Sequence, residues 1–272
     1  PDRLNTRIVT RSGAVSSLIN LEIVSAETCK SIIILGNCTD ASSPEDRAAS
    51  DTRVIKTALG VMASKGNNNF AIVAEVFDQR NREIMSNITK DEVVTFDTLD
   101  ILAKVLVQTS RSNGLSLVYS EIMSFDGCEM YFADGNWEES KFGEMQYHFP
   151  DGILMGIRRA DDELLINPAP DTLMQPDDDI LILANDDSTI QYLPNPVATH
   201  RDLNPVIERS EIQVERELII GWSTKIEIII REFNDYVRKG SQIDILVPQA
   251  DEESPSEKRE RQQWREKVAE ME

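Results

Sequence analysis

A buried strand, a polar loop and an amphipathic helix follow one another between Lys30 and Met62, and this order constrains the fold most. Ser31 to Leu35 is a short β-branched apolar run that ends at Gly36, which is typical of a strand covered on both faces in a parallel sheet. Apolar residues recur at helical spacing after Pro44, and Phe70 to Val76 is a second apolar run. The stretch therefore predicts a βαβ unit in a sheet with helices on both faces.

Composition limits the classes of function. The chain has 272 residues, of which 40% are hydrophobic, and this length predicts about two domains. No apolar run approaches the roughly 20 residues of a membrane span, so we expect no membrane insertion. The net charge of -20 argues against binding to nucleic acid or anionic membranes. A solvated acidic surface explains the charge, and cation binding is the alternative.

Residues 1–96 are predicted to form a Rossmann-like lobe that is incomplete at its N-terminus. Arg7 to Thr10 has the pattern of a strand, Val15 to Val24 that of a short helix, and Val93 to Phe96 that of the last strand. A complete dinucleotide-binding fold begins with an earlier strand, a glycine-rich turn and a helix. We therefore expect the first βα unit to be missing and the sequence to come from a longer protein.

Four further parts are expected. Residues 97–126 predict two helices that form a crossover hairpin, which either dimerises or covers the sheet. Residues 127–193 contain short strands between Pro, Gly and Asp clusters, which predict a small α+β lobe. A proline-rich linker spans 194–213, and residues 214–272 have the pattern of the beginning of a second Rossmann-like domain with a charged tail. The predicted fold class is therefore α/β.

Taken in order, several short motifs resemble the cytosolic regulatory region of the CASTOR and POLLUX family of ion channels, an RCK (regulator of potassium conductance) or TrkA-N-like region. The resemblance implies tandem regulatory domains below a tetrameric pore of the same full-length chain, on the cytosolic face of a membrane. It implies a homo-oligomer that senses ions or small ligands, with no enzymatic activity. The matching strings are TRSG at 10–13, IIILGNCTD at 32–40, AIVAEVFD at 71–78, FPDGILMGI at 149–157, LLINPAPDTLMQPDDDILILA at 164–184 and ELIIGW at 217–222.

The first candidate ligand contacts are Arg11 and Ser12, which follow the predicted strand at Arg7 to Thr10. A dinucleotide site has an acidic residue at the end of its second strand, where it binds the ribose hydroxyls. This chain has an arginine and a serine there, so nucleotide binding is disfavoured. Arg11 can instead bind a phosphate or an acidic group, and a structural salt bridge is the alternative.

The second candidate contacts are Asn37, Thr39 and Asp40, in the loop after the Ser31 strand. Open α/β sheets bind ligands at the carboxyl ends of their strands, so these side chains can line a small-ligand or cation site. Alternatively Thr39, Asp40 or Ser43 caps the next helix.

Metal binding and catalysis have weaker signals. The three consecutive acids 177–179 predict either a Ca2+ site or a turn, and the spacing of a calcium-binding loop is absent. The three cysteines show no metal-ligand spacing, and no nucleophile elbow, HExxH or P-loop motif is present. The sequence therefore predicts no definite cofactor. Ca2+ or another cation is the candidate, and a nucleotide is disfavoured.

Two alternative functions stay open from the sequence. A subunit of a Trk-type potassium-uptake system shares the fold and binds a nucleotide. An NAD-dependent oxidoreductase truncated before its cofactor-binding turn is a second alternative.

Overall fold

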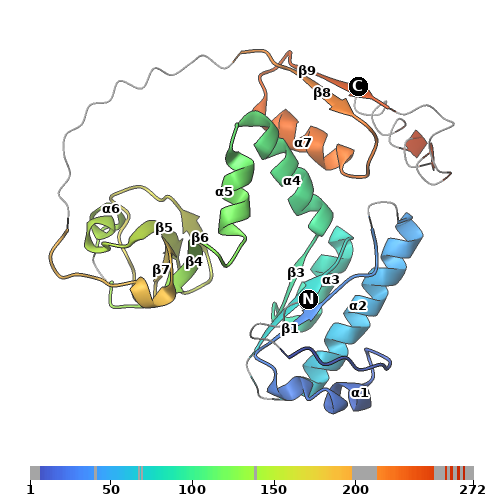
Figure 1. Cartoon of the computed structure of the whole chain (residues 1–272), viewed down its shortest axis with the longest axis horizontal. Coiled ribbons are helices and arrows are strands. Elements are labelled where there is room, and N and C mark those ends of the chain that lie inside the picture. Colours follow the sequence, from blue (N-terminus) through green and yellow to red (C-terminus); the bar gives the residue numbers. More distant parts are fainter. Residues whose placement is uncertain are drawn as a thin grey trace. The chain divides into compact units, whose positions relative to one another are not determined.

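The computed structural model describes residues 7–39, 42–66, 68, 70–137, 140–197, 213–247 and single positions between 255 and 266. The chain divides into two compact units, one of residues 1–107 and 212–272 and the other of residues 108–211. Both combine helices and strands (Figure 1), so the α/β fold class is confirmed. The five domain boundaries predicted from the sequence are finer than this division and remain a prediction.

A three-stranded parallel sheet forms the centre of the first unit, with the strand order β1-β2-β3. Ile32, Ile72 and Val93 lie side by side in its register. Each strand is joined to the next by a helix, and right-handed connections that proceed in the same direction across a sheet place their helices on the same face. The two connecting helices also contact each other. The elements are α1 (Leu18–Ile23), the 3-10 turn η1 (Ala26–Thr28), β1 (Ser31–Ile34), α2 (Pro44–Lys65), β2 (Ala71–Glu75), α3 (Gln79–Thr89) and β3 (Val93–Phe96).

The apolar core of this unit lies between the sheet and its helices. Ile34, Ile72 and Ala74 of the sheet pack there against Val54 and Val61 of α2. Side chains alternate between the two faces of a strand, so their neighbours point to the other face. The core therefore belongs to one face of the sheet.

The expectation that the Ser31 strand is covered on both faces is wrong for the described residues. Ile33 is 68% exposed and Leu35 is 72% exposed, and Val94 on β3 is exposed as well. Ile33, Val73 and Val94 form one row across the sheet. This second face is exposed because both connecting helices lie on the first.

The strand predicted at Arg7 to Thr10 is not formed, and these residues have no regular secondary structure. Ile8 and Val9 are mostly exposed. A β-branched pattern favours a strand only where the side chains pack against neighbours, and here they bury too little surface.

Both ends of α2 are fixed by the residues that the sequence places there. The Ser43 hydroxyl accepts a hydrogen bond from the Asp46 amide at 3.1 Å, and Pro44 occupies the first turn, where its missing N–H costs nothing. Gly66 ends the helix with φ 60, a conformation that glycine adopts most readily. Ser43, one of the three caps predicted from the sequence, is therefore the N-cap of α2.

A second parallel strand pair, β8 (Arg216–Ile220) and β9 (Gln242–Leu246), also belongs to the first unit. Helix α7 (Ile226–Tyr236) connects the two strands and buries Ile226 and Phe233. This confirms the predicted opening of a second βαβ unit. The predicted charged tail lies largely outside the described residues, as does most of the linker.

The predicted helix pair is present as α4 (Thr98–Arg111) and α5 (Leu115–Ile122). Gly114 precedes α5 with φ 88, so a residue with a side chain is strained at this turn. Leu102 and Leu106 of α4, and Leu117 and Val118 of α5, are exposed. Both helices therefore present apolar side chains at the surface.

The second unit contains a four-stranded antiparallel sheet with the order β4-β7-β5-β6. Its central strand β7 buries Ile180 and Ile182, which pack with Leu154, Ile157 and Met145. The strands predicted between 128 and 185 are thereby confirmed. The elements are β4 (Glu129–Ala133), α6 (Phe142–Met145), η2 (Gln146–His148), β5 (Gly152–Arg158), β6 (Leu164–Ile166), β7 (Asp179–Ala184) and η3 (Asp187–Thr189).

The segment that follows η3 is bound back onto this unit. The Leu193 amide donates to the His148 carbonyl at 2.9 Å, and the Val197 amide donates to the Tyr147 carbonyl at 2.8 Å. The His148 and Tyr192 rings stack with centroids 4.8 Å apart, and Tyr192 also contacts Trp137 edge-on. The chain is thus attached to the lobe up to Val197.

Candidate functional site

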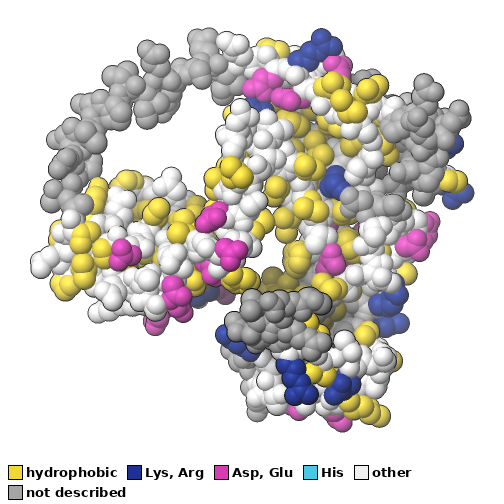
Figure 2. Space-filling view, viewed as in Figure 1, with side chains coloured by type: hydrophobic (Ala, Val, Ile, Leu, Met, Phe, Trp, Pro, Cys, Tyr) yellow, Lys and Arg dark blue, Asp and Glu magenta, His cyan; other side chains and the backbone are white. Residues whose placement is uncertain are grey.

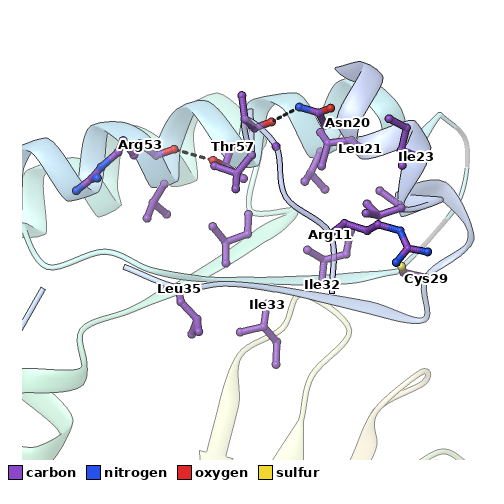
Figure 3. Close-up of a pocket in the computed structure, with 18 of the residues that line it drawn as sticks. Arg11, Asn20, Leu21, Ile23, Cys29, Ile32, Ile33, Leu35, Arg53 and Thr57 are labelled. Atoms are coloured by element: carbon purple, nitrogen blue, oxygen red, sulfur yellow. Dashed lines mark hydrogen bonds between the residues drawn. The ribbon is translucent and has the colours of Figure 1, made fainter. Parts of the chain in front are cut away.

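A cavity of about 740 Å3 lies beside the free edge of β1 in the first unit (Figure 3). Residues 31–35 form one wall, and α2 contributes Val54 and Val61 to the opposite wall. Among the described strands, β1 pairs only with β2, so its outer edge faces the cavity. The volume is in the range of small-molecule sites, which are mostly apolar with a few polar groups.

The polypeptide around Arg11 closes one end of the cavity. The Asn20 side-chain amide of α1 donates to the Ala14 carbonyl at 3.1 Å, which fixes residues 11–15 against the helix. A Cβ atom at Gly13 would lie 2.7 Å from the Asn20 side chain, so a larger residue there would displace Asn20. The Arg11 guanidinium donates to the Thr10 carbonyl at 2.9 Å, and Cys29 lies next to it in Figure 3.

The polypeptide around Asn37 closes the cavity at the carboxyl end of β1. The Asn37 amide donates to the Ser50 hydroxyl at 2.8 Å, and the Gly36 amide donates to the Glu75 carboxylate at 2.9 Å. A side chain at Gly36 would collide with Phe77 at 2.7 Å. These contacts fix the loop before it reaches α2.

The structure brings together three of the five predicted ligand residues. Arg11, Ser12 and Asn37 line the same cavity, although more than twenty positions separate the first pair from the third. Thr39 does not line it, and its amide donates to the Ser42 hydroxyl at 2.9 Å. Asp40 lies outside the described residues. Ligand binding by these residues remains a prediction.

Sequence reasoning missed Arg53 and Thr57, which line the cavity from α2. The Thr57 hydroxyl donates to the Arg53 carbonyl at 2.8 Å, a bond within the helix. Figure 3 shows Arg53 and Arg11 toward opposite ends of the cavity. The sequence signal that could have found them is their spacing. Positions 53, 57 and 61 are four residues apart and therefore lie on one side of a helix.

The buried carboxylate nearest this part of the sheet has a structural role. Asp51 is entirely buried and accepts hydrogen bonds from the Phe77 and Asp78 amides, both at 3.0 Å, and from the Asn81 side chain at 2.9 Å. Asp78 in turn caps α3, since its carboxylate accepts from the Asn81 amide at 3.1 Å. Asp51 therefore holds the end of β2 to the start of α3.

The three consecutive acids in the second unit do not form a cation site. Asp178 forms an ion pair with Arg159, and Asp179 forms one with Arg158. The Asp178 carboxylate also accepts from the Gln175 amide at 2.6 Å, and Asp177 has φ 62, as in a turn. Within the described residues no group of three or more His, Cys, Asp and Glu side chains is placed to hold a metal ion.

The fold is similar to that of a known structure. The human SLO3 gating ring superimposes with a TM-score of 0.59 at 13% sequence identity, over 88% of this chain and 55% of that one. At this identity the likeness concerns the fold alone.

Sequence comparison then shows which ion channels the chain is similar to. Residues 99–200 match the family model described as "Castor and Pollux, part of voltage-gated ion channel". The probable ion channel CASTOR of Oryza sativa subsp. japonica is 28% identical over 261 residues, which is 93% of this chain and 28% of that protein. The ion channel DMI1 of Medicago truncatula is 26% identical over 266 residues, or 96% of this chain and 28% of that protein. The chain is thus similar to part of the CASTOR and POLLUX ion channels, and the resemblance is confirmed.

The match covers only part of each relative. The chain spans about 28% of the length of the curated relatives named here. In the part of the chain that the structure describes, no helix has the length and apolar character needed to cross a membrane.

Proposed function

We propose that the chain is the cytosolic regulatory region of a cation channel of the CASTOR and POLLUX type, which senses an ion or a small ligand and acts on a pore. The observation that carries the proposal is the coincidence of a gating-ring fold with a Castor and Pollux match at residues 99–200. The pore belongs to the same full-length chain. The role requires no chemical step, so the region is not an enzyme.

Ligand binding performs gating work only through a difference in affinity between the open and closed arrangements of the channel. The cavity beside β1 is a suitable sensor because it lies between separate segments, with β1 on one side and residues 11–15 and α1 on another. A bound molecule favours the arrangement in which these segments fit it best. The permeant ion is a cation, with K+ and Ca2+ as the candidates.

Assembly into a homo-oligomer, a tetrameric ring in the full-length protein, completes the proposal. Leu117 is 74% exposed and Phe125 is 91% exposed, at the start of α5 and just after its end. Exposed apolar side chains that gather on a surface mark interaction sites, and Figure 2 shows apolar side chains at the surface of α5. Self-association through this surface gives the ring its contacts.

The test measures currents through the full-length protein that carries this sequence, in planar bilayers, with Leu117→Asp as the variant. Charge at a buried subunit contact weakens assembly, so we expect the open probability to change and the purified chain to shift to a smaller species in sedimentation. Ser116→Asp is the matched control, because Ser116 is also exposed on α5 and points about 100° around the helix from Leu117. Unchanged currents and unchanged sedimentation in Leu117→Asp would contradict the proposal.

A further inference from the structure

The charges around the cavity differ in sign from those of the whole chain. The chain carries 48 acidic and 28 basic residues, yet the charged residues that line the cavity are Arg11 and Arg53, with no aspartate or glutamate among the lining residues. In the described part of the chain neither guanidinium forms an ion pair with a carboxylate. Their charge is available to an acidic ligand.

The walls of the cavity are apolar along the length of β1. The accessible apolar surface comes from Ile32, which is half-buried, and from Ile33 and Leu35, which are exposed. Five residues of an extended strand span roughly 16 Å. Figure 3 shows Arg11 at one end of this row of apolar side chains. The cavity is therefore elongated and mostly apolar, and the Arg11 guanidinium lies at one of its ends.

We propose that the cavity binds a single-chain amphiphile with an acidic headgroup, either a carboxylate or a phosphate. The guanidinium of Arg11 binds the headgroup through paired N–H donors, which match the oxygens of both groups. The apolar tail lies along β1 and displaces water from Ile32, Ile33 and Leu35. This names the ligand class of the proposed sensor and in that respect rests on the proposed function.

The test uses the purified chain and titration calorimetry with dodecanoate and dodecyl phosphate below their micelle concentrations. Dodecanol provides the same tail without charge, and inorganic phosphate provides the headgroup without a tail. We expect saturable binding of at least one acid, with dodecanol and inorganic phosphate at least tenfold weaker. Each methylene removed from the tail weakens binding about fourfold. Tighter binding of dodecanoate indicates a fatty acid, and tighter binding of dodecyl phosphate indicates a single-chain lipid phosphate such as a lysophospholipid.

Arg11→Gln removes the charge but keeps an exposed polar side chain, so the fold is preserved. We expect it to weaken binding about tenfold or more, and Arg53→Gln to weaken it less, because the headgroup lies at the Arg11 end. Arg80→Gln is the matched control on the exposed side of α3 and leaves binding unchanged.

Methyl NMR spectra locate the ligand independently of its affinity. Shifts at Ile32 and Ile34, with none at Ile182 of the other unit, support the cavity. Equal binding of dodecanol and dodecanoate, or equal binding by Arg11→Gln and the native chain, would overturn the proposal. So would the absence of binding by both acids. None of these results alters the current measurement, which depends on α5, so the two proposals fail separately.

Discussion

The two sheets of this molecule bury their side chains in different ways. The antiparallel sheet of the second unit has Ile180 and Ile182 buried at its centre, with α6 and Phe149 packed against them. The parallel sheet of the first unit buries one face and leaves Ile33 and Val94 exposed on the other. A parallel sheet is normally covered on both faces. The antiparallel sheet also exposes Ile153 and Ile166, but its strand β7 buries Leu181 on one face and Ile180 and Ile182 on the other. The comparison teaches that the two units differ in how fully a central strand is covered.

Alanine substitution of one isoleucine in each sheet gives the largest expected contrast. Ile182→Ala removes a side chain with no exposed surface and should cost about 2–5 kcal/mol of unfolding free energy, because a cavity remains. Ile33→Ala should change it by less than about 0.5 kcal/mol. Urea unfolding followed by circular dichroism measures both. Equal losses of unfolding free energy in the two variants would show that the second face of the parallel sheet is covered in solution.

Asp51→Asn tests how strongly the first unit depends on its internal polar contacts. An asparagine offers one acceptor oxygen, so at least one of the three donors to Asp51 loses its partner. Burying an unpaired donor should destabilise this unit by roughly 2–3 kcal/mol. Amide exchange should show faster opening around Phe77 and Asn81 while the antiparallel sheet keeps its protection.

The control for this change is Glu45→Gln, which neutralises an exposed carboxylate on α2. Its effect should stay below about 0.5 kcal/mol. Uniform acceleration of exchange in both units by Asp51→Asn would contradict their independence.

Ser43→Ala sharpens the comparison at the helix that covers the parallel sheet. The substitution removes the acceptor of the Asp46 amide and should cost about 1 kcal/mol. Ser43→Thr keeps a hydroxyl at this position and should lower the unfolding free energy by only a few tenths of a kcal/mol. Thermal unfolding of the two variants side by side measures the difference, and equal melting temperatures would show that another group caps α2.

The smallest effect concerns pH and the strand pair β8 and β9. The pKa of Asp244 is lowered, chiefly by the hydrogen bond from Arg216 and then by one from Gln242. A carboxylate with a lowered pKa in the folded state adds stability above its unfolded pKa, and this stability is lost as the pH falls through the folded value. The pH range in which this stability is lost therefore lies below about pH 4.

Arg216→Gln should raise the pKa of Asp244 back toward that of an isolated aspartate. Carbon-detected NMR titration of the Asp244 carboxyl group in both proteins measures this change. An identical titration in the variant would show that Arg216 does not determine the pKa.

Most elements of the fold were predictable because their signals are local. The apolar run at Ser31, the helical spacing after Pro44 and the apolar run at Phe70 are each read within a few residues, and each element appears where expected. The predicted strand at Arg7 to Thr10 failed because a strand also needs a neighbour, which no local pattern supplies. The exposed face of the sheet was missed because it depends on the side to which each helix crosses.

The candidate site was predictable only in part. Arg11 and Asn37 were found because each follows an apolar run, but nothing in the sequence states that they border one cavity. Arg53 and Thr57 were missed because polar residues on a helix are usually solvated. Their position beside the edge of β1 follows from the packing of α2, which is a tertiary property.

The attachment of the chain after η3 has a mechanical consequence. The hydrogen bonds from the Leu193 and Val197 amides and the stacked rings of His148 and Tyr192 fasten this segment to the turn before β5. A pull on the chain beyond Val197 is therefore transmitted to the Tyr147–Phe149 turn and the aromatic cluster around Trp137, rather than to the end of β7. The antiparallel sheet is relieved of the load, and the aromatic cluster becomes the point at which tension enters the lobe.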